Sequence, residues 1–244
     1  MRCHMIRTII WFFYFWLYLI AILPALYKAN HLAKKGNTNE RDQLVYRVAN
    51  RWAQSMVNMT GSTIKVTGKE HVPANTAVVF VSNHQGNFDI PILIGFINKP
   101  KAFIAKIELL KLPLIRSWMK HLNCVFMDRS DMRQSLRTIK LASDYLKEGY
   151  SMVIFPEGTR SKGNTMGDFK PGSIKLALKA EVPIIPITIR GSYKIMEQNR
   201  FGITMKPAIV EIIISEPVST TNLTKEQAKE LPDKVKEIIQ NNLN

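Results

Sequence analysis

Apolar and polar positions along this chain form two alternating patterns. Seven short runs rich in β-branched and aliphatic residues predict strands, at residues 64–67, 77–82, 102–105, 124–127, 152–155, 184–189 and 209–214. Longer stretches with apolar residues at helical spacing lie between them, at residues 130–147, 171–180 and 224–242. Gly149 follows the first, a proline opens the second, and Thr224 opens the third with a capping-box pattern. Strands separated by helices predict an α/β fold, a single domain with a largely parallel mixed sheet covered by helices.

The N-terminal pattern is different, because no charge occurs between Thr8 and Tyr27 and most of this stretch is aromatic or aliphatic. Such a run is long enough to cross a bilayer as one helix. A cleaved signal peptide is disfavoured because no small-x-small site follows the run. A spanning helix normally has basic residues on one side only, whereas here they flank both: Arg2, Arg7, Lys28, Lys34 and Lys35. We therefore expect a segment that lies in one leaflet of the cell membrane, at its cytoplasmic face.

A second amphipathic stretch, residues 40–59, has apolar residues at every fourth position and ends before Gly61. Its pattern fits a helix that packs on the domain core as well as one that packs on the membrane. We expect two parts: residues 1–61 as a membrane-associated helical anchor, and residues 62–244 as the α/β domain.

The charge of the chain narrows the choice of partner. A net charge of +15 favours polyanionic partners, which include nucleic acid, anionic lipid and phosphorylated substrates. No helix-turn-helix, zinc-finger or aromatic RNA-binding signature is present, so we expect no nucleic acid. The two cysteines, Cys3 and Cys124, are too few for a disulfide framework and lack the spacing of a zinc site. This usage indicates a reducing compartment.

Two motifs carry candidate chemistry. Residues 83–89 (NHQGNFD) place His84 five positions before Asp89, and residues 155–161 (FPEGTRS) contain Glu157 and Arg160. Histidine beside a carboxylate is typical of a general base with its orienting acid, and arginine is suited to holding an anion. Residues five apart do not share a helix face, so the pair requires a turn before the helix that Asp89 opens. Asp89 alone could equally be a helix cap, and residues 157–160 an ordinary turn.

Both motifs follow predicted strands, and open α/β sheets bind ligands at the carboxyl ends of their strands. Lys106 and Arg129 follow two further strands, although each alone could be a solvated surface residue. These residues occur together in one domain that follows a membrane anchor. In combination they indicate a base that acts on a hydroxyl group of a phosphorylated substrate.

In four ordered blocks the chain resembles the 1-acylglycerol-3-phosphate O-acyltransferases, whose first block is known as HX4D. The blocks are residues 83–89, 125–129 (VFMDR), 155–161 and 182–187 (VPIIPI), with the stretch 106–109 (KIEL) also similar. The second block usually begins with glycine, where this chain has Asn123, the best non-glycine residue for a positive φ. The resemblance covers roughly residues 64–213 and implies the glycerolipid acyltransferase fold.

The resemblance also implies a reaction, the transfer of a fatty acyl group from a thioester to the sn-2 hydroxyl of lysophosphatidic acid, which gives phosphatidic acid for phospholipid synthesis. It implies His84 as the base and Asp89 as its orienting carboxylate, with no metal and no cofactor. The acyl donor is acyl carrier protein or coenzyme A, and membrane lipids are the other partners. The substrate-binding residues implied are Lys106, Arg129, Glu157, Gly158, Thr159 and Arg160, with Glu157 orienting the cations or binding glycerol.

Two alternatives stay open. One is an acyltransferase that acts on another lysophospholipid or on glycerol-3-phosphate, although Thr159 favours lysophosphatidic acid because glycerol-3-phosphate enzymes tend to have glycine there. The other is a non-catalytic membrane protein that binds anionic lipid, against which the intact pair of His84 and Asp89 argues.

Overall fold

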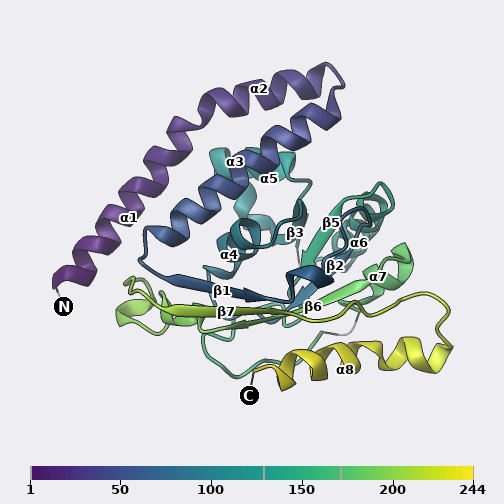
Figure 1. Cartoon of the computed structure of the whole chain (residues 1–244). Coiled ribbons are helices and arrows are strands. Elements are labelled where there is room, and N and C mark those ends of the chain that lie inside the picture. Colours follow the sequence, from purple (N-terminus) through teal and green to yellow (C-terminus); the bar gives the residue numbers. More distant parts are fainter. Residues whose placement is uncertain (1, 129, 171, 244) are drawn as a thin grey trace.

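The computed structural model describes residues 2–128, 130–170 and 172–243. Within them, seven strands form one sheet in the order β1-β7-β6-β2-β5-β3-β4 (Figure 1). The strands are β1 (Thr63–Thr67), β2 (Val79–Ser82), β3 (Lys101–Lys106), β4 (Val125–Met127), β5 (Ser151–Ile154), β6 (Ile184–Arg190) and β7 (Ile209–Ile214). Neighbouring strands are parallel except β6 and β7, which are antiparallel. The expected largely parallel mixed sheet is confirmed.

Helices cover both faces of the sheet. On one face lie α3 (Thr38–Asn58), α4 (Asp89–Phe96) and α5 (Pro113–His121), and on the other α6 (Met132–Lys147), α7 (Lys175–Ala180) and α8 (Lys225–Asn241). A hydrophobic core lies on each face of the sheet. Successive side chains of β2 point into one core and then the other, because side chains along a strand point to opposite faces. Phe80 is buried with Ala53 and Ile92 on the first face, and Val79 with Leu176 and Val235 on the second.

Local sequence signals account for most element ends. Thr224 caps α8 with the predicted capping box, and Asn123 adopts the positive φ of 57° that the glycine of similar blocks would supply. The helix expected at residues 171–180 begins later, at Lys175. Gly172 has a φ of 88°, which no α-helix contains, so the helix cannot start before it; Pro171 lies outside the described residues.

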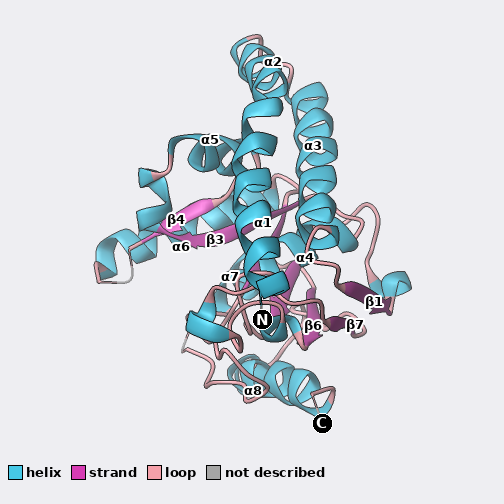
Figure 2. Ribbon diagram, turned by 90° about the vertical axis from the view of Figure 1, so that its left-hand side faces the viewer, coloured by secondary structure: helices cyan, strands magenta, loops and turns pink. Residues whose placement is uncertain are grey.

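The uncharged N-terminal run forms two helices rather than one, α1 (Arg2–Ala21) and α2 (Leu23–Lys34) (Figure 2). The chain turns at Ile22, and a proline occupies the first turn of α2, where its missing N–H is not needed. The two helices pack on α3 and α5 through a separate apolar cluster that includes Leu19, Leu26 and Trp118. By length and composition, residues 4–21 form one helix that could cross a membrane, and this apolar helix favours membrane association.

One side of α1 is bound to the domain along most of its length. Arg7 Nη1 donates to the Thr60 carbonyl oxygen at 3.1 Å, and Trp11 Nε1 donates to the Met56 carbonyl oxygen at 2.8 Å. Arg7, which the sequence suggested as a membrane flank, therefore faces the domain. The opposite side of α1 is apolar and exposed, with Ile6, Ile9, Phe13, Leu17 and Ile20 each more than half accessible.

Candidate active site

The candidate residues lie along one edge of the sheet, at the carboxyl ends of adjacent strands. The order β2-β5-β3-β4 brings the segment after β2, which contains His84, beside the segment after β5, which contains Glu157. Lys106 ends β3, and Asp128 follows β4. Arg129 lies outside the described residues, so its placement stays a prediction.

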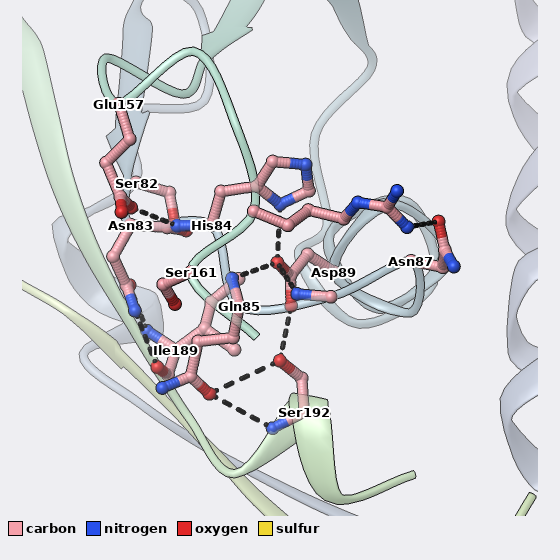
Figure 3. A network of polar contacts seen from close by, with 12 residues as sticks. Ser82, Asn83, His84, Gln85, Asn87, Asp89, Glu157, Ser161, Ile189 and Ser192 are labelled. Atoms are coloured by element: carbon pink, nitrogen blue, oxygen red, sulfur yellow. Dashed lines mark hydrogen bonds and ion pairs between the residues drawn. The ribbon is translucent and has the colours of Figure 1, made fainter. Parts of the chain in front are cut away.

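His84 and Asp89 meet as the sequence suggested. His84 lies in the turn after β2, and Asp89 is the first residue of α4, with Phe88 as the N-cap. His84 Nδ1 lies 2.6 Å from Asp89 Oδ2, which also accepts from the backbone N–H groups of Gln85 (2.7 Å) and Gly86 (2.9 Å) (Figure 3). A carboxylate only accepts, so this contact assigns the proton to Nδ1 and leaves Nε2 with the basic lone pair.

Asp89 is fully buried, and its second oxygen, Oδ1, accepts from the Ser192 hydroxyl. Gln85 joins the same network, because its Oε1 accepts from the Gly191 N–H at 2.8 Å and from the Ser192 N–H at 3.2 Å. The charge of Asp89 is thus balanced by four donors, which a buried carboxylate requires. Ser192 follows β6, about a hundred residues further along, and no local pattern in the sequence pointed to it.

Asn83 connects the catalytic turn, which is the segment of residues 83–88 between β2 and α4, to β6. Its Nδ2 donates to the Ile189 carbonyl oxygen at 2.9 Å, and its Oδ1 accepts from the Ile189 N–H at 2.8 Å. The side-chain amide of Asn83 thus forms the same pair of hydrogen bonds with Ile189 that a backbone amide would form, and these bonds fix the start of the turn (Figure 3). Sequence reasoning missed this role of Asn83, although the residue lies inside the motif beside His84.

The second motif supports the first from the neighbouring strand. Phe155 stacks on the His84 imidazole, and Glu157 Oε1 accepts from the His84 backbone N–H at 2.7 Å. Glu157 Oε2 accepts from the Gly167 N–H at 2.7 Å, and burial raises the pKa of this carboxyl. The two carboxylate oxygens of Glu157 thus join the turn of His84 to the loop of Gly167. The expected role of Glu157 toward the cations or the glycerol of a substrate stays a prediction.

Arg160 lies next to the catalytic turn. Its Nη1 donates to the Asn87 side-chain oxygen and lies 3.7 Å from Glu197 Oε1. Glu197 is almost fully buried and accepts from the Asn87 N–H at 2.7 Å, and burial raises the pKa of its carboxyl. Sequence reasoning missed Glu197, which comes from the segment after β6, as Ser192 does.

The remaining predicted residues lie near this group with fewer contacts. Gly158 has a φ of 68°, a conformation that glycine adopts without strain, and Thr159 follows it in the same turn. Lys106 is largely exposed, and its ammonium group forms a surface ion pair with Glu108 at 2.7 Å. The structure therefore brings Arg160 to the catalytic turn more closely than Lys106.

These residues border a large cavity of about 1300 Å³. Apolar side chains of α1, α3 and α5 form one end, among them Phe15, Trp52 and Trp118. His84, Lys106, Gly158, Thr159 and Arg160 lie on its wall, and α6 and α7 border the other end. Among the described residues, no group of three or more His, Cys, Asp or Glu side chains is placed to hold a metal ion. The arrangement offers a base at Nε2 beside a space that accommodates a long apolar chain and an anion.

Comparison with known proteins gives concordant matches. The model of a family described as "Acyltransferase" matches residues 63–190. A probable 1-acyl-sn-glycerol-3-phosphate acyltransferase of Mycoplasma pneumoniae is 32% identical over 210 residues, which cover 81% of this chain and 77% of the relative. The 1-acyl-sn-glycerol-3-phosphate acyltransferase of Saccharomyces cerevisiae is 30% identical over 183 residues, which cover 73% of this chain and 59% of the relative.

A solved structure also matches over the full length of this chain. The crystal structure of the 1-acyl-sn-glycerophosphate (LPA) acyltransferase PlsC from Thermotoga maritima superposes with a TM-score of 0.84 at 27% identity. The match covers 100% of this chain and 97% of the other, so it includes the N-terminal helices as well as the sheet.

Proposed function

Because this chain belongs to the 1-acyl-sn-glycerol-3-phosphate acyltransferase family, we propose that His84 and Asp89 carry out its reaction. The enzyme transfers a fatty acyl group from an acyl thioester to the hydroxyl of 1-acylglycerol-3-phosphate, and the product is phosphatidic acid. The observation that carries the residue assignment is the 2.6 Å contact between His84 Nδ1 and the buried Asp89 carboxylate at the wall of the cavity.

The proposed chemistry is direct transfer. His84 Nε2 takes the proton of the sn-2 hydroxyl as the oxygen attacks the thioester carbon, and a C–O bond forms while the C–S bond breaks. The same proton then passes from the imidazolium to the departing thiolate. Asp89 keeps Nδ1 protonated and stabilises the imidazolium, as the carboxylate does in a serine-protease triad. Cys124 is an unsuitable nucleophile, because burial raises the pKa of its thiol to about 12.

We assign the acceptor phosphate to Arg160, with Lys106 and Arg129 as further cations. Arg160 lies beside the catalytic turn and presents a planar fork of donors, which matches phosphate oxygens. Gly158 and Thr159, which line the same wall, would adjoin the glycerol part of the acceptor. The assignment of Arg129 rests on the resemblance of residues 125–129 alone.

We further propose that α1 lies in one leaflet at the cytoplasmic face of the membrane. A spanning α1 would draw α3 into the hydrocarbon, because Trp11 and Phe15 of α1 contact Met56 and Trp52 of α3 and Arg7 contacts Thr60 just after it. α3 carries Arg47 and Arg51 on its surface, and charged side chains in the bilayer centre are costly. An in-plane α1 instead buries its exposed apolar side in lipid and leaves α3 above it.

The division of the chain at residue 61 also remains a proposal. α3 belongs to residues 1–61, yet it buries Ala49, Ala53 and Val57 in the core that covers the sheet. We therefore expect α1 and α2 to supply the membrane contact and α3 to join them to the α/β domain.

The decisive experiment is an assay of purified protein with a panel of acceptors. The panel contains lysophosphatidic acid, other lysophospholipids and glycerol-3-phosphate, each offered with acyl-coenzyme A and with acyl carrier protein thioester, and mass spectrometry identifies the product. We expect phosphatidic acid from lysophosphatidic acid. Product from another acceptor alone would reassign the substrate, and binding of anionic lipid without product from any pair would favour a non-catalytic protein.

A further inference from the structure

The cavity continues past His84 to a second end that the acceptor does not explain. This end is bordered by Met132, Leu136 and Ile139 of α6 and by Lys175 and Lys179 of α7. Met132 and Leu136 are exposed, with 75% and 60% of their surfaces accessible. Exposed apolar side chains of α6 and two lysines of α7 thus line the same cavity.

The charged side chains at this end of the cavity are basic. Lys175 and Lys179 are both exposed and lie one helical turn apart, so their ammonium groups project from one face of α7. Lys170 borders the same end. Among the described residues that line the whole cavity, Glu108 is the acidic one, and it is already paired with Lys106. The positive charge of these side chains therefore attracts anions to this end of the cavity.

α7, which carries the lysines, covers the face of the sheet opposite to α3 and α5, on which α1 and α2 pack. Figure 1 shows α1 on the left and α6 and α7 on the right, and the exposed apolar residues of α1 mark the membrane side. A lipid acceptor that arrives from the leaflet meets the end of the cavity lined by Phe15, Leu19 and Ile22. A ligand that reaches the exposed lysines of α7 comes instead from the aqueous side.

We propose that the phosphopantetheine arm of the acyl donor lies along the part of the cavity lined by α6 and α7, with Lys175 and Lys179 binding its phosphate. The inference rests on the proposed function, since it assigns the second substrate of that reaction. The arm joins a thioester to a phosphate through a flexible, partly apolar chain, so its phosphate must lie well away from the reacting carbon. Lys175 and Lys179 line the cavity from α7, whereas Arg160 adjoins the catalytic turn itself. The side chains of Met132 and Leu136 would contact the apolar part of the arm.

Coenzyme A and acyl carrier protein both carry this arm and its phosphate, so the assignment predicts the same effect with either donor. The test variant is Lys175→Gln with Lys179→Gln. The matched control is Lys225→Gln with Lys229→Gln, which removes an equally spaced and equally exposed pair from α8, outside the cavity lining. Steady-state kinetics with each donor then separate donor KM, acceptor KM and kcat.

We expect the test variant to raise the KM for both thioesters about 10-fold or more, since each charged contact to a phosphate contributes a factor of this order. Acceptor KM and kcat at saturating donor should stay at wild-type values, and the control should match wild type. A direct measurement accompanies the kinetics, namely calorimetric binding of a thioether analogue of acyl-coenzyme A that cannot transfer its chain. Its Kd should rise with the test variant, and the control should leave it unchanged.

Three results would overturn the assignment. The first is unchanged donor KM and unchanged analogue binding in the test variant. The second is a rise in acceptor KM instead, which would move the lysines to the acceptor phosphate. The third is a rise with one donor alone, because the contact would then lie on the nucleotide or on the carrier protein surface and not on the shared arm. Failure of the proposed function is distinguishable, since wild type would then make no phosphatidic acid whatever the donor.

Discussion

The ring of Phe155 stacks on the imidazole of His84, with 4.0 Å between the ring centroids and 18° between the planes. Asp89 holds the same imidazole at its Nδ1 edge, so one ring is fixed from its face and from its edge. The two contacts come from two motifs on adjacent strands, β5 and β2. The motifs therefore work as one unit that aims Nε2 at the cavity.

This geometry predicts a large and specific loss when the base is removed. His84→Ala should lower kcat by about 100- to 10,000-fold, the usual contribution of a general base. Asp89→Asn should lower it in the same direction, because an amide can donate to Nδ1 and stabilise the wrong tautomer. Acyl transfer to lysophosphatidic acid by the purified variants measures both effects. Circular dichroism and thermal melting of His84→Ala serve as the folding control, and near-normal turnover by a folded variant would rule out His84 as the base.

The two cations nearest the site should differ in importance. Arg160→Ala should raise the KM for lysophosphatidic acid by roughly 10- to 100-fold, since a charged hydrogen bond to phosphate contributes about 1.5–3 kcal/mol. Lys106→Ala should raise it less, because Lys106 is largely exposed and already paired with Glu108. Initial rates at varied acceptor and saturating donor test the order. If Arg160→Ala left the acceptor KM unchanged and raised that of the thioester, Arg160 would belong to the donor site.

Glu197 gives a prediction about stability and pH. Burial raises the pKa of its carboxyl, so the folded state disfavours the charged form. The stability that this raised pKa contributes is present below the unfolded-state pKa, near the ordinary 4.5, and is lost as the pH rises through the higher folded-state pKa. Glu197→Gln keeps the shape and an acceptor for the Asn87 N–H but has no charge to bury.

We therefore expect Glu197→Gln to stabilise the fold by about 1 kcal/mol at pH 8 and by clearly less near pH 5. Thermal melting at the two pH values measures the difference, and Glu216→Gln, at an exposed position, is the matched control. A Glu197→Gln variant less stable than wild type at pH 8 would show that the contact with Arg160, 3.7 Å away, outweighs the burial.

The fold could be predicted from the sequence because its signals are local. Seven apolar runs gave the strands, and the capping box at Thr224 gave the start of α8. Asn123 was expected to replace a glycine at a positive φ, and it does so. The predicted start of α7 was wrong. A proline suggested an N-terminus before Gly172, but the φ of 88° at Gly172 is incompatible with a helix there.

The residues of the candidate site also differ in whether local sequence signals predict them. The motifs themselves contain His84 and Asp89, so a turn and a helix start were enough to predict their contact. Ser192 and Glu197 act on that turn through the folded sheet, from a segment about a hundred residues away. Neither lies in a periodic or motif-like stretch, and only the order β6-β2-β5 brings that segment beside His84.

The last prediction concerns the side of the membrane on which the ends of the α1–α2 unit, within residues 1–61, lie. In the in-plane arrangement both ends of the α1–α2 unit lie at the cytoplasmic face, because α1 is bound along α3 and its other side is apolar. Single cysteines at Arg2 and at Lys35, in a background without Cys3 and Cys124, test this with a membrane-impermeant thiol reagent. Both should be protected in intact cells and labelled in inverted vesicles, and each Lys or Arg near the anionic surface adds about 1 kcal/mol to this orientation. The buried Cys124 is the position to replace by alanine, since it contributes to the core and not to the chemistry. Labelling of Arg2→Cys from outside intact cells would show that α1 spans the membrane, and it would leave the assignment of His84 and Asp89 untouched.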